Sequence, residues 1–341
     1  MDNLVFITGG SGHIGSRVMV ESLQAGYHVR AAVRSQAKAD KILSIPSIKA
    51  LNPGPKLEFV TIPDLLVDGA YDEAIKGATY AIHVASPIEE RHSAGESYTK
   101  TLVEPAIKGT LNILVAAKKT GSIRRVVITS SIEAIVPENV FMSGSATTFN
   151  EKSRTPSVPG PYHSTGDAYS AGKIAALNET EAWVSRERDA IGFDVVHIFP
   201  GYVLGRSELV TNAADAVRGT NKVVLGPVTG LDLGPTPGFS VHLRDVAMAH
   251  VKSLEPEVPG NRGYLLISGD VEGTRWEDVF DVVARHFPEA VETGVISNNG
   301  NISSIPLKID NSETERLLGF RHRSFEEQVK DVVGHYLELI T

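Results

Sequence analysis

The chain has 341 residues, of which 42% are hydrophobic and 22% are charged, and its formal net charge is −8. These values are typical of a globular protein with a packed core, and the acidic balance argues against a general binder of nucleic acids or anionic membranes. The absence of cysteine excludes disulfides, thiolate metal sites and a cysteine nucleophile.

The first half of the chain alternates short runs rich in Val and Ile with helical stretches. Its start lacks the basic residues and long apolar core of a signal peptide, and no run is long enough to span a membrane, so we expect a cytoplasmic protein. We expect buried strands over 4–8, 28–33, 57–62, 80–85 and 126–129, with helices over 13–25 and 98–119. This alternation predicts an α/β fold of the Rossmann type, with a doubly wound parallel sheet.

The second half of the chain differs in composition from the first. A polar stretch over 144–166 precedes a predicted long helix, and residues 226–239 are so rich in Gly and Pro that a substrate loop or mobile lid is expected there. The other elements expected are helices over 167–188, 241–254, 274–286 and 324–339 and strands over 194–199 and 263–267. The sequence therefore predicts a large domain and a smaller, discontinuous one.

A glycine-rich turn, TGGSGHIG at residues 8–15, joins the first strand to the first helix. It fits G-x-x-G-x-x-G through Gly9, Gly12 and Gly15, and G-x-G-x-x-G if Gly10 is counted. The missing Cβ atoms let the backbone approach a pyrophosphate, which the N–H groups at the start of the helix would bind. A plain strand-to-helix turn is the alternative, but the context favours a dinucleotide site.

The residues after the second strand select between the two nicotinamide dinucleotides. An acidic residue there would bind the ribose hydroxyls of NAD, whereas this chain has Arg34, with Lys38 and Lys41 just beyond. A guanidinium can bind a 2′-phosphate, so NADP is favoured over NAD, although Arg34 could also be a solvated strand end. Asp64 and Leu65, after the third strand, stand where contacts with adenine are expected.

A phenol and an ammonium share one face of the predicted helix over 167–188. Tyr169 and Lys173 are four residues apart, and a nearby cation lowers the pKa of a phenol, which suits it to acid–base work. Ser131 ends the fifth strand and is placed to polarise a carbonyl oxygen. A Tyr-x-x-x-Lys pair alone is more often a surface pair. Its place behind the glycine turn and the Ser-Ser strand end favours catalysis.

Together these motifs resemble the extended branch of the short-chain dehydrogenase/reductase superfamily. The resemblance is greatest to dihydroflavonol reductase-like enzymes, and among them to fungal NADPH-dependent aldehyde and ketone reductases of the methylglyoxal type. It is carried by TGGSGHIG at 8–15, YHVRAAVR at 27–34, DLLVDGAYDEAIKGAT at 64–79, HVASP at 83–87, EPAIKGTLNIL at 104–114, RRVVITSS at 124–131, YSAGK at 169–173 and VHLRDVAMAHV at 241–251.

The resemblance implies site residues and domain roles. It implies that Ser131, Tyr169 and Lys173 are catalytic and that NADPH is the cofactor. The cofactor-binding residues would be Gly9, Gly12, His13, Ile14, Gly15, Arg34, Lys41, Asp64, Leu65, Val84, Ala85, Lys173, Pro200 and Val203. The NADP-binding domain would then comprise 1–200, with 241–269 returning to it, and the substrate-binding domain 201–240 and 270–341.

Departures from the family pattern concern the substrate. Val136 stands where the flavonoid enzymes carry an asparagine, and Gly166-Asp167-Ala168 precede Tyr169 in place of the motif of cinnamoyl-CoA reductases. Neither plant substrate is therefore expected. Val136, Tyr202 and Phe239 are candidates for a substrate pocket wall, but each could equally be core.

The sequence thus predicts an NADPH-dependent reductase of a small-molecule carbonyl substrate, a ketone or an aldehyde, with a secondary-metabolite ketone suggested by the family. One alternative is an NAD-dependent sugar-nucleotide epimerase or dehydratase, and another is a non-catalytic dinucleotide sensor. His83 is expected to be structural, and His242 with Asp245 to cap a helix start. No histidine pair has metal-ligand spacing, so no metal is predicted.

Overall fold

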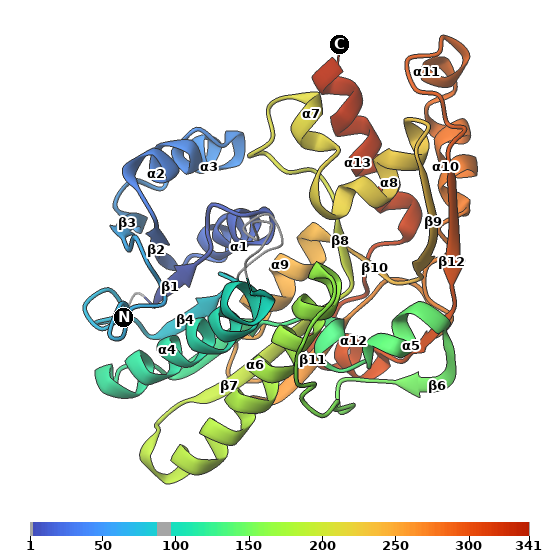
Figure 1. Ribbon diagram of the computed structural model, residues 1–341. Helices are drawn as coiled ribbons and strands as arrows, with labels where there is room; N and C mark the ends of the chain where they lie inside the picture. Colours follow the sequence, from blue (N-terminus) through green and yellow to red (C-terminus); the bar gives the residue numbers. More distant parts are fainter. Residues whose placement is uncertain (1–2, 87–96, 341) are drawn as a thin grey trace. The chain divides into compact units, whose positions relative to one another are not determined.

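A computed structural model describes residues 3–86 and 97–340, which form two compact units (Figure 1). The first unit comprises residues up to 138, 151–199 and 247–264, and the second comprises 139–150, 200–246 and 265 onward. Residues 139–150, which the sequence assigns to the first domain, belong to the second unit because β6 (Ser145–Phe149) pairs with β13 (Leu307–Ile309).

The first unit is built on a seven-stranded sheet in the order β11-β7-β5-β4-β1-β2-β3. The pairs from β7 to β3 are all parallel, and most of their residues are buried, as expected for strands covered on both faces. This confirms the predicted fold class. The strands are β1 (Leu4–Thr8), β2 (His28–Val33), β3 (Leu57–Thr61), β4 (Tyr80–His83), β5 (Arg125–Thr129), β7 (Asp194–Pro200) and β11 (Arg262–Leu266).

The strand order places a candidate site at one edge of this sheet. The chain adds β2 and β3 on one side of β1 and then crosses over to add β4 and β5 on its other side. The direction in which strands are added therefore reverses between β1 and β4. In such sheets, ligands bind outside the carboxyl ends of the strands at this switch point. The glycine turn follows β1, Val84 and Ala85 follow β4, and Ser131 follows β5, so all of them lie at that edge.

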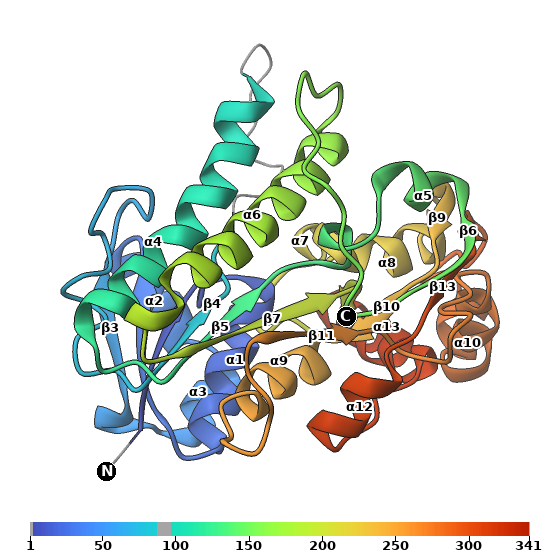
Figure 2. The ribbon, with the colours of Figure 1, turned by 90° about the horizontal axis from the view of Figure 1, so that it is seen from below.

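Helices cover both faces of the sheet, as Figure 2 shows. On one face α4 (Glu104–Thr120), which continues the π-helical segment η3 (Thr99–Val103), packs against α6 (Thr165–Glu187). Gly172 of α6 lies against this segment, where a Cβ would be in ordinary contact with Ala106 and with the Leu102 carbonyl oxygen, each at 3.5 Å. The opposite face carries α1 (His13–Gln24), and the remaining elements of this unit include α2 (Gln36–Leu43), α3 (Pro46–Leu51) and the short turn η4 (Ile132–Ala134).

The second unit has its own core, centred on the fully buried Trp276. Its strands form three two-stranded parallel sheets, β10 with β8, β12 with β9 and β13 with β6. The bounds of these strands are β8 (Tyr202–Leu204), β9 (Asp232–Pro237), β10 (Ser240–His242) and β12 (Asn301–Ile305). The helices of this unit are α5 (Glu138–Ser143), α7 (Ala213–Ala216), α8 (Lys222–Val228), α10 (Asp278–His286), α11 (Pro288–Glu292), α12 (Ser312–Leu318) and α13 (Phe325–Ile340). The helix α9 (Leu243–Lys252) begins in this unit and passes into the first one at Ala247.

The expectation of a loop or lid over 226–239 is wrong for most of that segment. Its first residues end α8, where Pro227 is tolerated inside the helix, and its centre is β9, which pairs with β12. Gly234 (φ +63°) permits an irregular register with β12, so the glycines shape a short strand. The segment is therefore part of the framework of the second unit.

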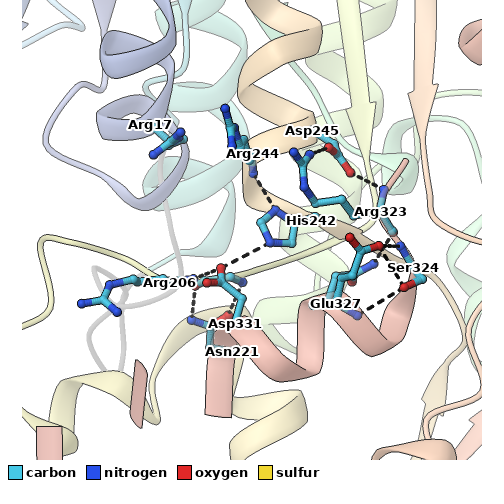
Figure 3. A network of polar contacts seen from close by, with 12 residues as sticks. Arg17, Arg206, Asn221, His242, Arg244, Asp245, Arg323, Ser324, Glu327 and Asp331 are labelled. Carbon is cyan, nitrogen blue, oxygen red and sulfur yellow. Dashed lines mark hydrogen bonds and ion pairs between the residues drawn. The ribbon is translucent and has the colours of Figure 1, made fainter. Parts of the chain in front are cut away.

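Residues of the second unit form polar contacts around the start of α9, and Figure 3 shows His242, Asp245, Arg323 and Asp331 among them. His242 accepts a hydrogen bond from the N–H of Arg244 at 3.0 Å through Nδ1, so it caps the helix as predicted. Its Nε2 lies 3.3 Å from the Asp331 carboxylate of α13. Asp245 was expected to cap as well, but it is fully buried and instead binds the backbone N–H and the guanidinium of Arg323.

In the described part of the chain, every helix is too short or too polar to cross a lipid bilayer.

Candidate active site

The glycine turn is shaped by two glycines that have no room for a side chain. Gly9 has φ +74°, and a Cβ there would lie 2.6 Å from the backbone nitrogen of Ala85. At Gly15 a Cβ would lie 2.2 Å from the Gly9 carbonyl oxygen. Glycine is therefore required at both positions to let the turn close on itself and against the end of β4.

Gly12 has a different role, because its missing Cβ leaves space free. Its backbone is extended (φ −101°, ψ 175°), and the nearest atom to a Cβ at this position would be the Gly9 carbonyl oxygen at 3.4 Å. Gly12 is also the N-cap of α1, which has no side-chain cap. The first N–H groups of α1 can therefore bind an anion that lies over Gly12, and this fits the pyrophosphate of a dinucleotide.

The next strand ends carry the residues expected around the adenosine. Arg34 follows β2 directly and is exposed, and Lys41 is exposed in the last turn of α2. Asp64 follows β3, and its carboxylate accepts a hydrogen bond from the N–H of Leu66 at 2.8 Å, which fixes this turn. Neighbouring Leu65 is half-buried, and its carbonyl accepts a hydrogen bond from Asn112 at 3.0 Å.

Val84 and Ala85 are held against the glycine turn by the last residue of β1. The Thr8 hydroxyl accepts a hydrogen bond from the N–H of Ala85 at 3.3 Å and lies 2.9 Å from Nδ1 of His83. Burial lowers the pKa of His83 to about 3, with a smaller effect from Lys173, so this imidazole is neutral. His83 is therefore structural, as predicted. The last residue of the HVASP segment, Pro87, lies outside the described residues.

Ser131 stands at the end of β5, where the sequence predicts it. Its backbone is extended, it is the N-cap of η4, and its hydroxyl oxygen accepts a hydrogen bond from the N–H of Glu133 at 3.2 Å. The hydroxyl proton stays available for an outside acceptor, such as a carbonyl oxygen.

Tyr169 and Lys173 lie one turn apart in α6. The side chain of Ser164 accepts a hydrogen bond from the N–H of Asp167 at 3.0 Å and so starts this helix two turns before Lys173. The Lys173 Nζ is 5.5 Å from the centre of the Tyr169 ring. The structure therefore brings together the two side chains that the sequence pairs.

Lys173 is 7% exposed, and its ammonium faces the ring of Tyr169. Burial lowers the pKa of Lys173 to about 8, and the negative charge of Glu133 partly opposes that shift. A buried ammonium normally has hydrogen-bond partners. Ribose hydroxyls of a dinucleotide would supply them, which is a second sign that the site fits this cofactor.

Glu133 is a residue of this site that the sequence reasoning missed. It lies in η4, and its carboxylate accepts a short hydrogen bond from the hydroxyl of Ser170, the residue after Tyr169. The sequence shows a carboxylate two residues after Ser131, but no sequence motif indicates that this carboxylate contacts α6.

A small polar cavity lies under Lys173, between α6 and the sheet. Its volume is about 20 Å³, and its lining includes Ser130, Thr180 and His197. In the described structure neither Thr180 Oγ1 nor His197 Nδ1 has a hydrogen-bond partner. Burial lowers the pKa of His197 to about 4, so this second imidazole near Lys173 is also neutral.

The candidates for substrate contact lie in separate units. Val136 is fully buried after η4 in the first unit. In the second unit Tyr202 stacks on Phe239, with ring centres 5.4 Å apart, and Trp276 meets the edge of Tyr202. Pro200 ends β7 and Val203 lies in β8, and both are buried. His163 is exposed before α6.

No metal site is formed within the residues that the structure describes, since no three His, Asp or Glu side chains gather there as ligands.

Comparison with known proteins places the chain in a family. The model of the NAD dependent epimerase/dehydratase family matches residues 5–264. Ketoreductase CTB6 of Cercospora beticola is 38% identical over 99% of this chain and 96% of its own length. NAD-dependent epimerase/dehydratase ALT6 of Alternaria alternata is 37% identical over 97% of each chain.

Solved structures have the same fold. The yeast methylglyoxal/isovaleraldehyde reductase Gre2, complexed with NADPH, superposes with a TM-score of 0.81 at 24% identity, covering 99% of each chain. Vestitone reductase from alfalfa (Medicago sativa) gives a TM-score of 0.74 at 23% identity, again over 99% of each chain. The chain belongs to the NAD dependent epimerase/dehydratase family, in the extended branch of the short-chain dehydrogenase/reductase superfamily that its motifs predict.

Proposed function

We propose that the protein is an NADPH-dependent carbonyl reductase in which Ser131, Tyr169 and Lys173 are the catalytic residues. One observation carries this proposal: the buried Lys173 ammonium lies 5.5 Å from the centre of the Tyr169 ring. Both residues belong to α6, which follows the strand β5 and Ser131 in the chain. Full-length relatives named ketoreductases, at 38% and 32% identity, support the reaction class.

NADPH is supported as the cofactor by the residue after β2. Arg34 offers an exposed guanidinium where an NAD enzyme would carry a carboxylate that repels a 2′-phosphate. The solved relatives Gre2 from yeast and from Candida albicans are complexes with NADPH. The rival function is that of an NAD-dependent epimerase or dehydratase, the name that the relative ALT6 bears. Arg34 argues against this function, because it stands where an NAD-dependent enzyme would carry a carboxylate.

The residues present suit the parts of this cofactor. The N–H groups at the start of α1 would bind the pyrophosphate over Gly12, Arg34 and Lys41 the 2′-phosphate, and Lys173 the nicotinamide ribose. We assign the remaining predicted contacts, Asp64 and Leu65 on the adenine side and Val84, Ala85, Pro200 and Val203 on the nicotinamide side, to the same proposal. When bound, NADPH supplies the hydride that reduces the carbonyl carbon.

The chain's own residues then act on the carbonyl oxygen. The Ser131 hydroxyl donates a hydrogen bond to that oxygen and favours the negative charge that develops on it. The Tyr169 hydroxyl donates its proton to the same oxygen, which completes the alcohol. The Lys173 ammonium stabilises the phenolate that Tyr169 becomes after it has given up the proton.

The substrate proposed is a small ketone or aldehyde. A ketone of a secondary metabolite is consistent with the ketoreductase names of the fungal relatives. Of the candidate contacts, Val136 and Phe239 are buried as core residues, so Tyr202, which is half-buried, is the proposed contact. The second unit is proposed as the substrate-binding domain.

The proposal is tested by following NADPH consumption with a panel of aldehydes, diketones and aromatic ketones. Tyr169→Phe should lower turnover by roughly 10²–10⁴-fold, because it removes the proton donor. NADPH binding, measured by protein fluorescence, should be unchanged, since the lost hydroxyl acts on the substrate. A Tyr169→Phe variant that reduces the same carbonyl at the wild-type rate would disprove the assignment.

A further inference from the structure

Glu133 forms hydrogen bonds with the candidate catalytic residue Ser131 and with Ser170, the neighbour of Tyr169. Its backbone N–H donates to the hydroxyl oxygen of Ser131 at 3.2 Å, and its carboxylate accepts from the hydroxyl of Ser170. The turn after β5 and the helix α6 are therefore tied together beside Tyr169, which directly precedes Ser170. Ser170 is 4% exposed, so this bond is shielded from water and strengthened by its surroundings.

Glu133 also supplies the charge that acts on Lys173. Titratable groups face this ammonium from β4 (His83), from β7 across the cavity (His197), from α6 (Tyr169) and from η4 (Glu133). Burial keeps the pKa of both imidazoles at about 3 and about 4, so they carry no charge at neutral pH. In the described residues, the charge that opposes the burial of Lys173 is that of Glu133.

We propose that Glu133 is a positioning residue of this enzyme, which aligns Ser131 and α6 through its two hydrogen bonds and balances the buried ammonium of Lys173 with its carboxylate. This inference rests on the proposed function, because the effect on catalysis requires the Lys173 ammonium to act beside the Tyr169 phenol. Glu133 touches no reacting atom, and it acts through the residues that do.

The two contributions of Glu133 can be separated by substitution. Glu133→Gln removes the charge but keeps an oxygen that accepts the Ser170 hydroxyl proton. Ser170→Ala removes that hydrogen bond but keeps the charge. Glu138→Gln is the matched control: Glu138 carries a nearby carboxyl group, and its hydrogen bond with Asp167, with a smaller effect from the charge of Glu133, raises its pKa to about 7.

Titration of Lys173 tests the charge directly and needs no substrate. In protein labelled with [ε-¹³C]lysine, the Lys173 resonance is assigned by its loss in Lys173→Arg and is followed from pH 6 to 11. Removal of the negative charge disfavours the ammonium, so the Lys173 midpoint should fall below its wild-type value of about 8 in Glu133→Gln. It should stay at that value in Glu138→Gln.

The pH profile of carbonyl reduction tests the consequence for catalysis. The alkaline limb of kcat/KM should move to lower pH in Glu133→Gln, and a shift of about one unit would lower kcat/KM at pH 8 about fivefold while leaving it near wild type at pH 6. Ser170→Ala should lower kcat at all pH values without moving the limb.

An unchanged Lys173 titration in Glu133→Gln would overturn the proposal. So would an equal loss of kcat/KM at every pH, which would mark a merely structural role. If the wild type reduces no carbonyl in the panel, the proposed function fails, while the lysine titration still decides whether Glu133 and Lys173 are coupled.

Discussion

Gly12 and Gly15 show how one residue type serves two purposes within four positions. At Gly15 the backbone of the turn occupies the space of a side chain, whereas at Gly12 that space opens toward the proposed pyrophosphate. The sequence pattern marks both glycines but does not distinguish them. The distances to the Gly9 carbonyl oxygen, 2.2 Å from a Cβ at Gly15 and 3.4 Å from one at Gly12, do so.

Gly12→Ala and Gly15→Ala should therefore fail in different ways. Gly12→Ala should fold with nearly wild-type stability, because its backbone suits alanine, but should bind NADPH more than about tenfold less tightly. Gly15→Ala should lose about 1–3 kcal/mol of unfolding free energy, because backbone must move. Urea unfolding and NADPH titration measure the two effects. A Gly12→Ala protein with unchanged NADPH affinity would contradict the proposed place of the pyrophosphate.

Arg34 should set the preference for NADPH. Arg34→Asp should raise the KM for NADPH by roughly 10–100-fold, as expected for the loss of a charge-assisted hydrogen bond, and should lower the preference for NADPH over NADH. Lys49→Asp is the control, because it makes the same charge change at an exposed position on α3. Steady-state rates with both nucleotides provide the measurement. Equal effects of the two substitutions would mean that Arg34 acts only through net charge.

The candidate site was predictable where a residue type had a fixed place in a motif. Ser131, Tyr169 and Lys173 stand at the strand end and the helix turn where the sequence expects them. Glu133 could not be found in this way, because its partner Ser170 is 37 residues further along the chain and only the packing of η4 on α6 brings them together.

At the scale of elements, the central sheet was predictable and most of the second unit was not. Strands such as β1, β5 and β7 are buried on both faces, and their Val and Ile residues give a clear signal. By contrast, β8 and β10 have three residues each and pair only with one another, so no periodicity reveals them. The predicted helix over 241–254 accordingly begins with a strand.

Arg125 forms hydrogen bonds with residues that lie far from it in the sequence. It begins β5, is 7% exposed, and forms two hydrogen bonds with Asp194 of β7, at 2.6 and 2.8 Å. Its guanidinium also donates to the carbonyl oxygen of Val258 at 2.9 Å. One side chain therefore connects two strands of the sheet with the segment that leads to β11.

Arg125→Met should lower the unfolding free energy by about 3 kcal/mol, because it leaves a carboxylate and a buried carbonyl without their donor. Lys76→Met is the matched control, since the Lys76–Glu73 pair is similarly short at 2.6 Å but mostly exposed. Its loss should cost less than about 0.5 kcal/mol. Urea unfolding of both variants gives the comparison. Similar losses would show that burial of the Arg125 pair contributes little.

At the scale of the whole molecule, the two neutral imidazoles under the site make stability depend on pH. The folded-state pKa values of His83 and His197, about 3 and about 4, lie below the value of about 6.5 for an unfolded chain. Between these values the unfolded chain binds protons that the folded one does not. The contribution of the two residues is therefore fully present above pH 6.5 and declines as the pH falls toward 4.

Each imidazole should contribute a slope that approaches about 1.4 kcal/mol per pH unit in this range. His197→Phe, which keeps a ring against Phe199, should reduce the slope by one such contribution whatever its effect on stability at pH 7. His163→Gln, at an exposed position, should leave the slope unchanged. Urea unfolding at pH 4.5–7.5 provides the measurement. An unchanged slope in His197→Phe would mean that His197 is protonated in the folded protein.

The division of the chain has a consequence for its synthesis. The polypeptide passes from one unit to the other after residues 138, 150, 199, 246 and 264, so neither unit is a continuous stretch. A nascent chain that has emerged as far as residue 200 still lacks the edge strand β11 and most of the second core. The first unit can therefore be completed on the ribosome only after residue 264, and the second only near the end of the chain, so a truncated gene product should be a substrate for chaperones and proteases.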